Sequence, residues 1–222
     1  MTLAVALVFA PMAFAWAPNG SVYRVNVAYD GGLANGEGAL GLAVSEDGRY
    51  VVFASSASNL VEGDTNGRYD IFWRDLVAQE TRLVNITVTD GFATEGAINY
   101  VDMTPDGRHV LFGSPDAHLV SEDTNGYYDV FVRDMVSEET TLVSTTSEGV
   151  QANWGSGDGS LSDDGRLVAF TTEAYNLFPD DENWRQDVVV KDLESGETTC
   201  VSMAYDGSGG NGHSFYPTIS GD

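Results

Sequence analysis

Residues 45–54 read SEDGRYVVFA, and similar stretches follow at residues 104–113 (TPDGRHVLFG) and 162–171 (SDDGRLVAFT). The turn aspartates of these stretches are 59 and then 58 positions apart, at Asp47, Asp106 and Asp164. Self-similarity at a fixed period is the signature of a repeat architecture. The chain therefore contains three full units of about 58 residues, which we place at residues 40–86, 99–145 and 158–203.

Each unit carries four short strand signals separated by Gly, Asp or Asn turns. In the first unit they lie at residues 40–45, 50–55, 69–74 and 81–86. The second signal is a continuous apolar run, whereas a strand with one wet face alternates apolar and polar residues, so both faces of this strand are covered. Repeated four-stranded antiparallel sheets with two covered faces are the blades of a β-propeller. We predict an all-β propeller over residues 16–222.

The repeats at the two ends are partial. Residues 22–28 match the fourth strand of a preceding unit, and residues 214–222 match the first strand of a following one. A closed propeller needs at least about four blades. The sequence therefore predicts an incomplete propeller, with three full repeats and two partial blade strands.

The Ser-x-Asp-Gly-Arg turn followed by a Val/Phe strand resembles the WD40-like (PD40) repeats of TolB-type propellers. The segment from Asn59 to Asp75, with Asp-Thr-Asn-Gly at residues 64–67, is similar to a form found in exported bacterial propeller proteins. This resemblance implies the propeller fold and says little about activity, because propellers carry many unrelated functions.

The N-terminal residues have the pattern of a secretory signal. Residues 1–15 are uncharged and contain an apolar run, and Ala13-Phe14-Ala15 is a small-x-small cleavage pattern. Such a run is too short to span a bilayer comfortably. We predict a signal peptide at residues 1–15, a mature chain without a membrane span, and a periplasmic or secreted location.

Composition narrows the possible partners. The chain of 222 residues has 34 acidic and 10 basic residues, for a formal net charge of −24. Because phosphate binding requires clustered Lys and Arg, a nucleic-acid partner is excluded. The single cysteine, Cys200, excludes an internal disulfide framework.

The loop between the second and third strands carries an Asp-x-Asn-x-x-x-Asp pattern in every unit. Calcium takes about six to eight oxygen ligands, and each loop could supply three of them. The same residues also suit an Asx-turn, in which the Asp and Asn side chains bond the local backbone. The sequence thus leaves two interpretations open for the candidate calcium residues Asp64, Asn66, Asp70, Asp123, Asn125, Asp129, Asp181, Asn183 and Asp187.

Strand order places these loops and the links between units at one end of the blades, which we call the loop face. Trp154, His213 and Tyr216 lie in or beside the links. The Asp-Gly-Arg turns lie at the opposite end, where Arg49, Arg108 and Arg166 can pair with Asp75, Asp134 and Asp192. The loop face is therefore acidic.

These features favour a non-enzymatic, exported binding or scaffold module. Its acidic loop face would meet a protein or glycan ligand, with calcium as a possible stabilising ion. No Gly-x-Ser-x-Gly elbow, Gly-rich phosphate loop or His-x-x-x-His pair occurs in the sequence. The alternative is the propeller domain of a larger hydrolase, similar to prolyl oligopeptidases, or of a glycan-cleaving enzyme.

Overall fold

The computed structural model describes residues 7–9, 12–16, 22–36, 40–97, 100–178, 184–207 and 209–221. Its main elements are three four-stranded antiparallel sheets, each formed by consecutive strands in sequence order. The first sheet contains β4 (Leu40–Val44), β5 (Tyr50–Ser55), β6 (Asp70–Asp75) and β7 (Glu80–Leu83). The second contains β8 (Val101–Met103), β9 (His109–Ser114), β10 (Asp129–Asp134) and β11 (Thr140–Leu142). The third contains β12 (Ser156–Leu161), β13 (Leu167–Thr172), β14 (Asp187–Asp192) and β15 (Thr198–Cys200).

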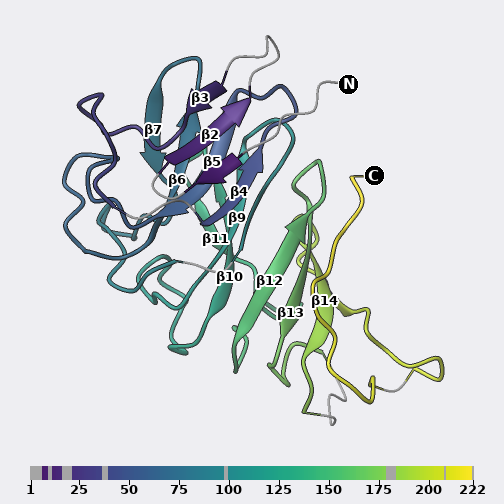
Figure 1. The fold of residues 1–222 in the computed structure, drawn as a ribbon. Helices are drawn as coiled ribbons and strands as arrows, with labels where there is room; N and C mark the ends of the chain where they lie inside the picture. The colour runs from purple at the N-terminus through teal and green to yellow at the C-terminus, as the bar shows by residue number, and fades with distance from the viewer. Residues whose placement is uncertain are drawn as a thin grey trace.

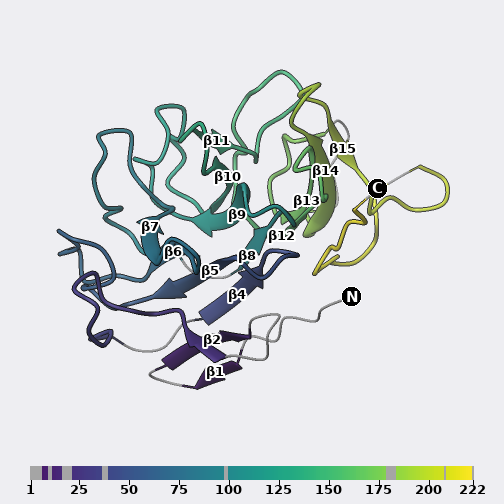
Figure 2. The same ribbon diagram turned by 90° about the horizontal axis from the view of Figure 1, so that it is seen from above.

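The three sheets are arranged as blades around a common centre (Figure 1, Figure 2). The first strands β4, β8 and β12 lie innermost, and β8 contacts both of the others. The last strands β7, β11 and β15 lie at the periphery (Figure 2). In the described part of the chain the sheets do not close into a ring. The all-β, incomplete propeller predicted from the repeats is therefore confirmed.

A three-stranded sheet precedes the first blade. It consists of β1 (Leu7–Phe9), β2 (Met12–Trp16) and β3 (Val22–Arg24), and it lies beside the first blade. The strand expected at residues 22–28 ends at Arg24 in the structure, and Val27 then forms an isolated bridge with Leu33.

Residues 214–221 contain no strand, in contrast to the partial strand expected at residues 214–222. The equivalent strands β4, β8 and β12 each pair with the strand that follows them.

The second strand of each blade is buried on both faces, as its apolar run predicts. In β5, Val51 and Phe53 belong to a cluster that also contains Val25, while Val52 and Ala54 pack between the first and second blades. The equivalent aromatic residues Phe53, Phe112 and Phe170 are all fully buried. Burial of each such side chain stabilises the fold by about 1.5–3 kcal/mol.

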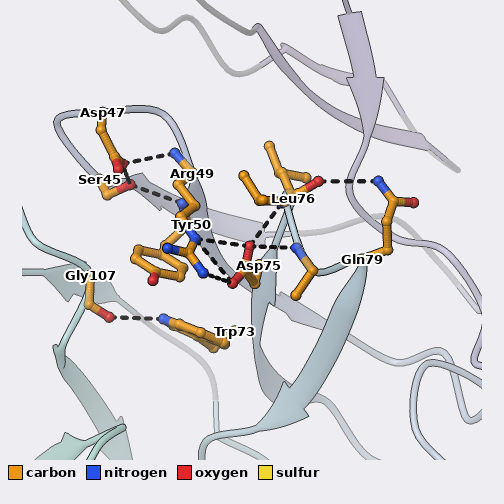
Figure 3. Close-up of polar contacts among 11 residues, drawn as sticks. Ser45, Asp47, Arg49, Tyr50, Trp73, Asp75, Leu76, Gln79 and Gly107 are labelled. Atoms are coloured by element: carbon orange, nitrogen blue, oxygen red, sulfur yellow. Dashed lines mark hydrogen bonds and ion pairs between the residues drawn. The ribbon is translucent and has the colours of Figure 1, made fainter.

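Each Asp-Gly-Arg turn is held by hydrogen bonds within the turn and by an ion pair to the third strand of its blade, as Figure 3 shows for the first blade. Asp47 Oδ1 accepts hydrogen bonds from Ser45 Oγ at 2.7 Å and from the Arg49 backbone N–H at 2.9 Å. The Arg49 guanidinium donates to both oxygens of Asp75, and this contact holds the pKa of the Asp75 carboxyl below its usual range. Equivalent Arg–Asp pairs occur in the other two blades. The predicted ion pairs are confirmed.

The first blade is bonded to the turn of the second. Trp73 Nε1 donates to the Gly107 carbonyl oxygen at 2.8 Å (Figure 3). The Tyr50 ring stacks on Trp73 with its centroid 4.6 Å away. Gly107 has a φ of 78°, and a methyl group there would lie 2.1 Å from Tyr50 Cδ2. The repeated glycine therefore allows close approach of neighbouring blades.

Candidate functional site

Strand register defines the two ends of the blades. Ser55 pairs with Asp70 at one end of the β5–β6 ladder, and Tyr50 pairs with Asp75 at the other. The Asp-x-Asn loops follow Ser55 and its equivalents Ser114 and Thr172. Those candidate calcium residues that the structure describes therefore lie at the opposite end from the Arg–Asp pairs, as the sequence predicts.

In the first blade, Asn66 forms the Asx-turn. Its Oδ1 accepts a hydrogen bond from the Arg68 backbone N–H at 2.8 Å. Its Nδ2 donates to Asp70 Oδ2 at 2.8 Å and to the Ala93 carbonyl oxygen at 3.0 Å. The amide nitrogen, rather than the amide oxygen, therefore faces the Asp70 carboxylate.

Asp64 and Asp70 form a pair of buried carboxylates beside this turn. Asp64 is only 6% exposed, and its Oδ1 atom has no hydrogen-bond partner. Burial and the nearby charge of Asp70 raise the pKa of Asp64. Burial also raises the pKa of Asp70, although Asn85 and Asn66 donate hydrogen bonds to it. The loop thus concentrates negative charge that its hydrogen-bond donors only partly balance.

In the second blade, a glutamine side chain joins the equivalent carboxylates. Gln151 Nε2 donates to Asp123 Oδ1 at 2.7 Å and to Asp129 Oδ2 at 3.0 Å. Ser144 Oγ donates to the other oxygen of Asp129. One oxygen of Asp123, Oδ2, keeps no partner. Asn125 again forms an Asx-turn, through the Tyr127 backbone N–H.

The first blade lacks this bridging amide. Gln151 forms an isolated β-bridge with Thr145, and at the equivalent bridge Ile86 faces Phe92. A phenyl ring cannot donate a hydrogen bond, so Asp64 and Asp70 share no common donor equivalent to Gln151. Each of the two fully described loops thus keeps one carboxylate oxygen without a partner, but only in the first does the carboxylate pair lack a bridging amide.

The third loop is described only in part. Asp187 Oδ1 accepts a hydrogen bond from Ser202 Oγ at 2.6 Å, and Asp187 Oδ2 is buried without a partner. The candidate ligands Asp181 and Asn183 lie outside the described residues. Across the described ranges, no three His, Cys, Asp or Glu side chains are grouped closely enough to hold a metal ion by themselves.

Other polar residues of the links are structural. Asn35 Oδ1 accepts from the Ser58 N–H, while Asn59 Oδ1 accepts from the Asn35 N–H, so the link is fastened to the loop. Asn153 and Asn176 repeat this arrangement. In the second blade, Asp116 takes the place of this asparagine pair. Its carboxylate accepts hydrogen bonds from the backbone N–H groups of Thr94, Glu95 and His118.

Exposed aromatic side chains line a groove on the same face. The rings of Tyr127 and Trp154 lie 4.5 Å apart between centroids, and those of Tyr175 and Trp184 lie 5.0 Å apart. They line two hollows, of about 440 Å³ and 340 Å³, which share Trp154, Glu173 and Gln186. Of the residues that line these hollows, Trp154 and His213 are among those that the sequence predicts on the loop face.

The repeat itself marks these aromatic residues, because they depart from it. Trp154 stands where the other units have Gly36 and Gly96. Tyr175 stands where they have Ser58 and Ala117. Neighbouring blades form the same fold with small residues at these positions, so the fold does not require the aromatic rings.

The blade arrangement makes this chain a β-propeller protein. No protein-family model and no curated protein matches it. Solved propeller structures do match, at 18% sequence identity or less in the three cases that follow. TolB from Acinetobacter baumannii has a TM-score of 0.51 at 18% identity, over 92% of this chain and 42% of TolB. The tricorn protease has a TM-score of 0.51 at 14% identity, over 86% of this chain and 17% of the protease.

A third match is an oligogalacturonate lyase in complex with manganese. It has a TM-score of 0.52 at 15% identity, over 88% of this chain and 49% of the lyase. The chain therefore spans less than half the length of each of these proteins, and the likeness shows the fold alone. Among the described residues, no helix is long and apolar enough to cross a membrane.

The buried carboxylates of the loop face predict an unusual pH dependence. Burial raises the pKa of Asp129 to about 6, whereas the unfolded value is near 3.8. The ionised form therefore destabilises the folded state at pH 7, and protonation removes this cost, worth about 2–3 kcal/mol, as the pH falls towards 4. The carboxyls paired with arginine have lowered pKa values and lose their stabilising effect only below about pH 4.

In the presence of EDTA we therefore expect the melting temperature to rise between pH 7 and pH 5. An Asp129→Asn variant, which imitates the protonated form, should show a smaller rise. Thermal melts at constant ionic strength measure both. A wild-type melting temperature that falls steadily from pH 7 to pH 5 would contradict the burial argument.

Proposed function

We propose that the chain is an exported, non-enzymatic β-propeller module that binds its ligand through the loop face. The observation that carries the proposal is the contrast between the two ends of the blades. At the turn end, the three Arg–Asp pairs neutralise their own charges. At the loop face, buried carboxylate oxygens lack partners and exposed aromatic rings line a groove. Among the described residues, the loop face alone combines carboxylate oxygens that lack hydrogen-bond partners with a groove lined by exposed aromatic rings.

Export follows from the signal pattern at residues 1–15. Cleavage after Ala15 would remove β1 and all of β2 except Trp16, and would place the mature chain in the periplasm or outside the cell. We expect N-terminal sequencing of the secreted protein to begin at Trp16. An intact Met1 in that material would refute the signal peptide.

Calcium is proposed as the ion that stabilises the loop face, with Asp64 and Asp70 of the first loop as its principal ligands. Asp64 Oδ1 supports this assignment because it is a buried carboxylate oxygen without a hydrogen-bond partner. A divalent cation would offset the repulsion between the two carboxylates, and backbone carbonyls and water can complete its shell. Asn66 acts as a turn residue in this proposal, since its amide nitrogen faces Asp70.

Thermal melts in calcium test this assignment. A bound ion stabilises the folded state by about 2.7 kcal/mol at a hundredfold excess over its dissociation constant. We expect millimolar CaCl₂ to raise the melting temperature, and MgCl₂ to raise it less because magnesium requires a stricter octahedral shell. NaCl at equal ionic strength is the control for screening of the −24 charge.

Two matched variants locate the ion. Asp64→Asn should abolish most of the calcium effect, whereas Asp123→Asn should retain most of it because Gln151 already bridges the second pair of carboxylates. Equal effects of NaCl and CaCl₂, or a full calcium response in Asp64→Asn, would show that the loops are Asx-turns only.

The alternative function is the propeller domain of a larger hydrolase. It is supported by the structural likeness to the tricorn protease and to prolyl endopeptidases, of which this chain covers 17% and 25%. Sequencing the gene on both sides of the codons for residues 1–222 discriminates between the two functions. A Gly-x-Ser-x-Gly segment in an adjoining domain would favour the hydrolase, and further repeats would favour the binding module.

A further inference from the structure

We propose that the groove around Trp154 binds a neutral oligosaccharide. The inference rests on the proposed function, because it assigns a ligand class to the loop face. Two hollows of about 440 Å³ and 340 Å³ meet at Trp154, Glu173 and Gln186. Cavities of this size hold small ligands rather than folded proteins. Because the two hollows share these lining residues, they adjoin at Trp154.

The aromatic rings are placed as stacking platforms. Tyr127 and Trp154 form one ring pair, and Tyr175 and Trp184 form another. Trp154, Tyr175 and Trp184 line the same hollow as Glu173 and Gln186. Trp184 is 73% exposed, and Trp154 is 44% exposed. The electron-rich face of an aromatic ring attracts the positively polarised C–H groups of an apolar surface. A pyranose ring presents such C–H groups on its faces and hydroxyl groups around its edge.

Polar groups between the rings can bind those hydroxyl groups. Trp154 Nε1 donates to Glu173 Oε2 at 3.0 Å, which fixes both the indole ring and the carboxylate. Each carboxylate oxygen can accept more than one hydrogen bond, so Glu173 remains able to accept from a hydroxyl group. His213 Nδ1 accepts from the Gln186 backbone N–H at 3.0 Å, and Arg185 Nη1 lies 3.4 Å from His213 Nε2. The Arg185 guanidinium, which carries only N–H donors, lines the same hollow. The groove therefore supplies both an acceptor and a donor.

The departure of these residues from the repeat supports a binding role. Trp154 replaces glycines of the other units, and Tyr175 replaces a serine and an alanine. Large rings that remain exposed contribute little to folding, and exposed apolar patches mark binding sites. Similar rings at all equivalent positions would instead have indicated a general packing role.

Charge selects a neutral ligand. With a net charge of −24, the protein repels polyanions such as polyuronates at long range. A quaternary ammonium ligand suits an aromatic cage, but Arg185 lines the same hollow and would repel it. A neutral saccharide satisfies both constraints and uses the rings as well as the hydrogen-bonding groups.

Titration calorimetry with the intact chain tests the proposal. The probes are cellotetraose, maltotetraose and N-acetylchitotetraose, with tetragalacturonate and choline as charged comparisons. We expect at least one neutral tetrasaccharide to bind with a submillimolar dissociation constant. We expect affinity to fall at least tenfold in Trp154→Ala and in Trp184→Ala, and to be unchanged in Tyr205→Ala, which removes an exposed ring outside the groove.

Melting temperatures of the three variants verify that each is folded. Trp184 is the most exposed tryptophan or tyrosine ring of the groove, so its replacement should destabilise the fold least. The proposal is overturned if no neutral probe binds at millimolar concentration, if tetragalacturonate or choline binds more tightly than every neutral probe, or if the folded Trp184→Ala variant binds as the wild type does.

The calcium response of the melting temperature is measured without sugar. A groove that fails this test in a chain that still responds to calcium leaves the proposed function intact.

Discussion

Replacement of Phe112 by alanine is expected to lower the free energy of unfolding by about 3–5 kcal/mol. Phe112 is fully buried in β9, and its ring lies 5.5 Å from that of Phe131 between centroids. It belongs to the cluster between the first and second blades, where Val52 and Met103 pack nearby. The truncation therefore leaves a cavity at a blade interface that backbone strands on both sides prevent from collapsing.

Urea denaturation measures this loss. Phe112→Leu is the matched control, because it preserves most of the volume and should cost less than about 1.5 kcal/mol. A loss below 1 kcal/mol in Phe112→Ala would mean that the two blades do not share this core.

Replacement of Gly107 by alanine is expected to lower the free energy of unfolding by about 3 kcal/mol or more, because a steric clash and backbone strain add to each other. The new methyl group would lie 2.1 Å from Tyr50 Cδ2, and Tyr50 is held in place by its stack on Trp73. The positive φ of 78° adds about 1–2 kcal/mol for any residue with a Cβ atom. The Trp73 hydrogen bond to the Gly107 carbonyl oxygen would also be displaced.

Gly126 provides the control for this substitution. Its φ of 71° is similar, but a methyl group there would meet no atom within 4 Å. Gly126→Ala should therefore cost only the backbone strain of about 1–2 kcal/mol. Equal melting temperatures of the two variants would contradict the contact between Tyr50 and the turn of the next blade.

The repeat made most of the fold predictable. The apolar run of the second strand predicted two covered faces because the side chains of a strand alternate between them, and Phe53 and Ala54 indeed enter different clusters. The pairing of Arg49 with Asp75 also followed from strand order alone, since both residues lie at the same end of adjacent strands.

The balance of charge in the loops was not predictable from the loop sequences. Asp64 and Asp123 occupy equivalent positions, and the difference between them depends on Gln151 and Phe92, which belong to the links that follow. The same limit applies to Asp116, whose backbone partners at Thr94 and Glu95 come from the preceding link. Such contacts join residues more than 20 positions apart, so they cannot be predicted from a short sequence motif.

The groove illustrates a different limit. Its residues come from the second and third blades and from the segment that follows β15, so only the packed structure brings them together. Comparison between the repeats gives the available signal, because Trp154 and Tyr175 replace small residues of the other units.

The central claim is our proposal that the loop face, and within it the first loop, binds a cation. Hydrogen exchange of the intact protein, measured by mass spectrometry with 2 mM CaCl₂ and with NaCl of equal ionic strength, tests it most directly. We predict that calcium slows exchange in residues 62–71 and in the neighbouring link at residues 85–95, while the turns at residues 45–49, 104–108 and 162–166 are unchanged. Uniform slowing across the chain, slowing at those turns, or identical exchange in the two salts would contradict the claim.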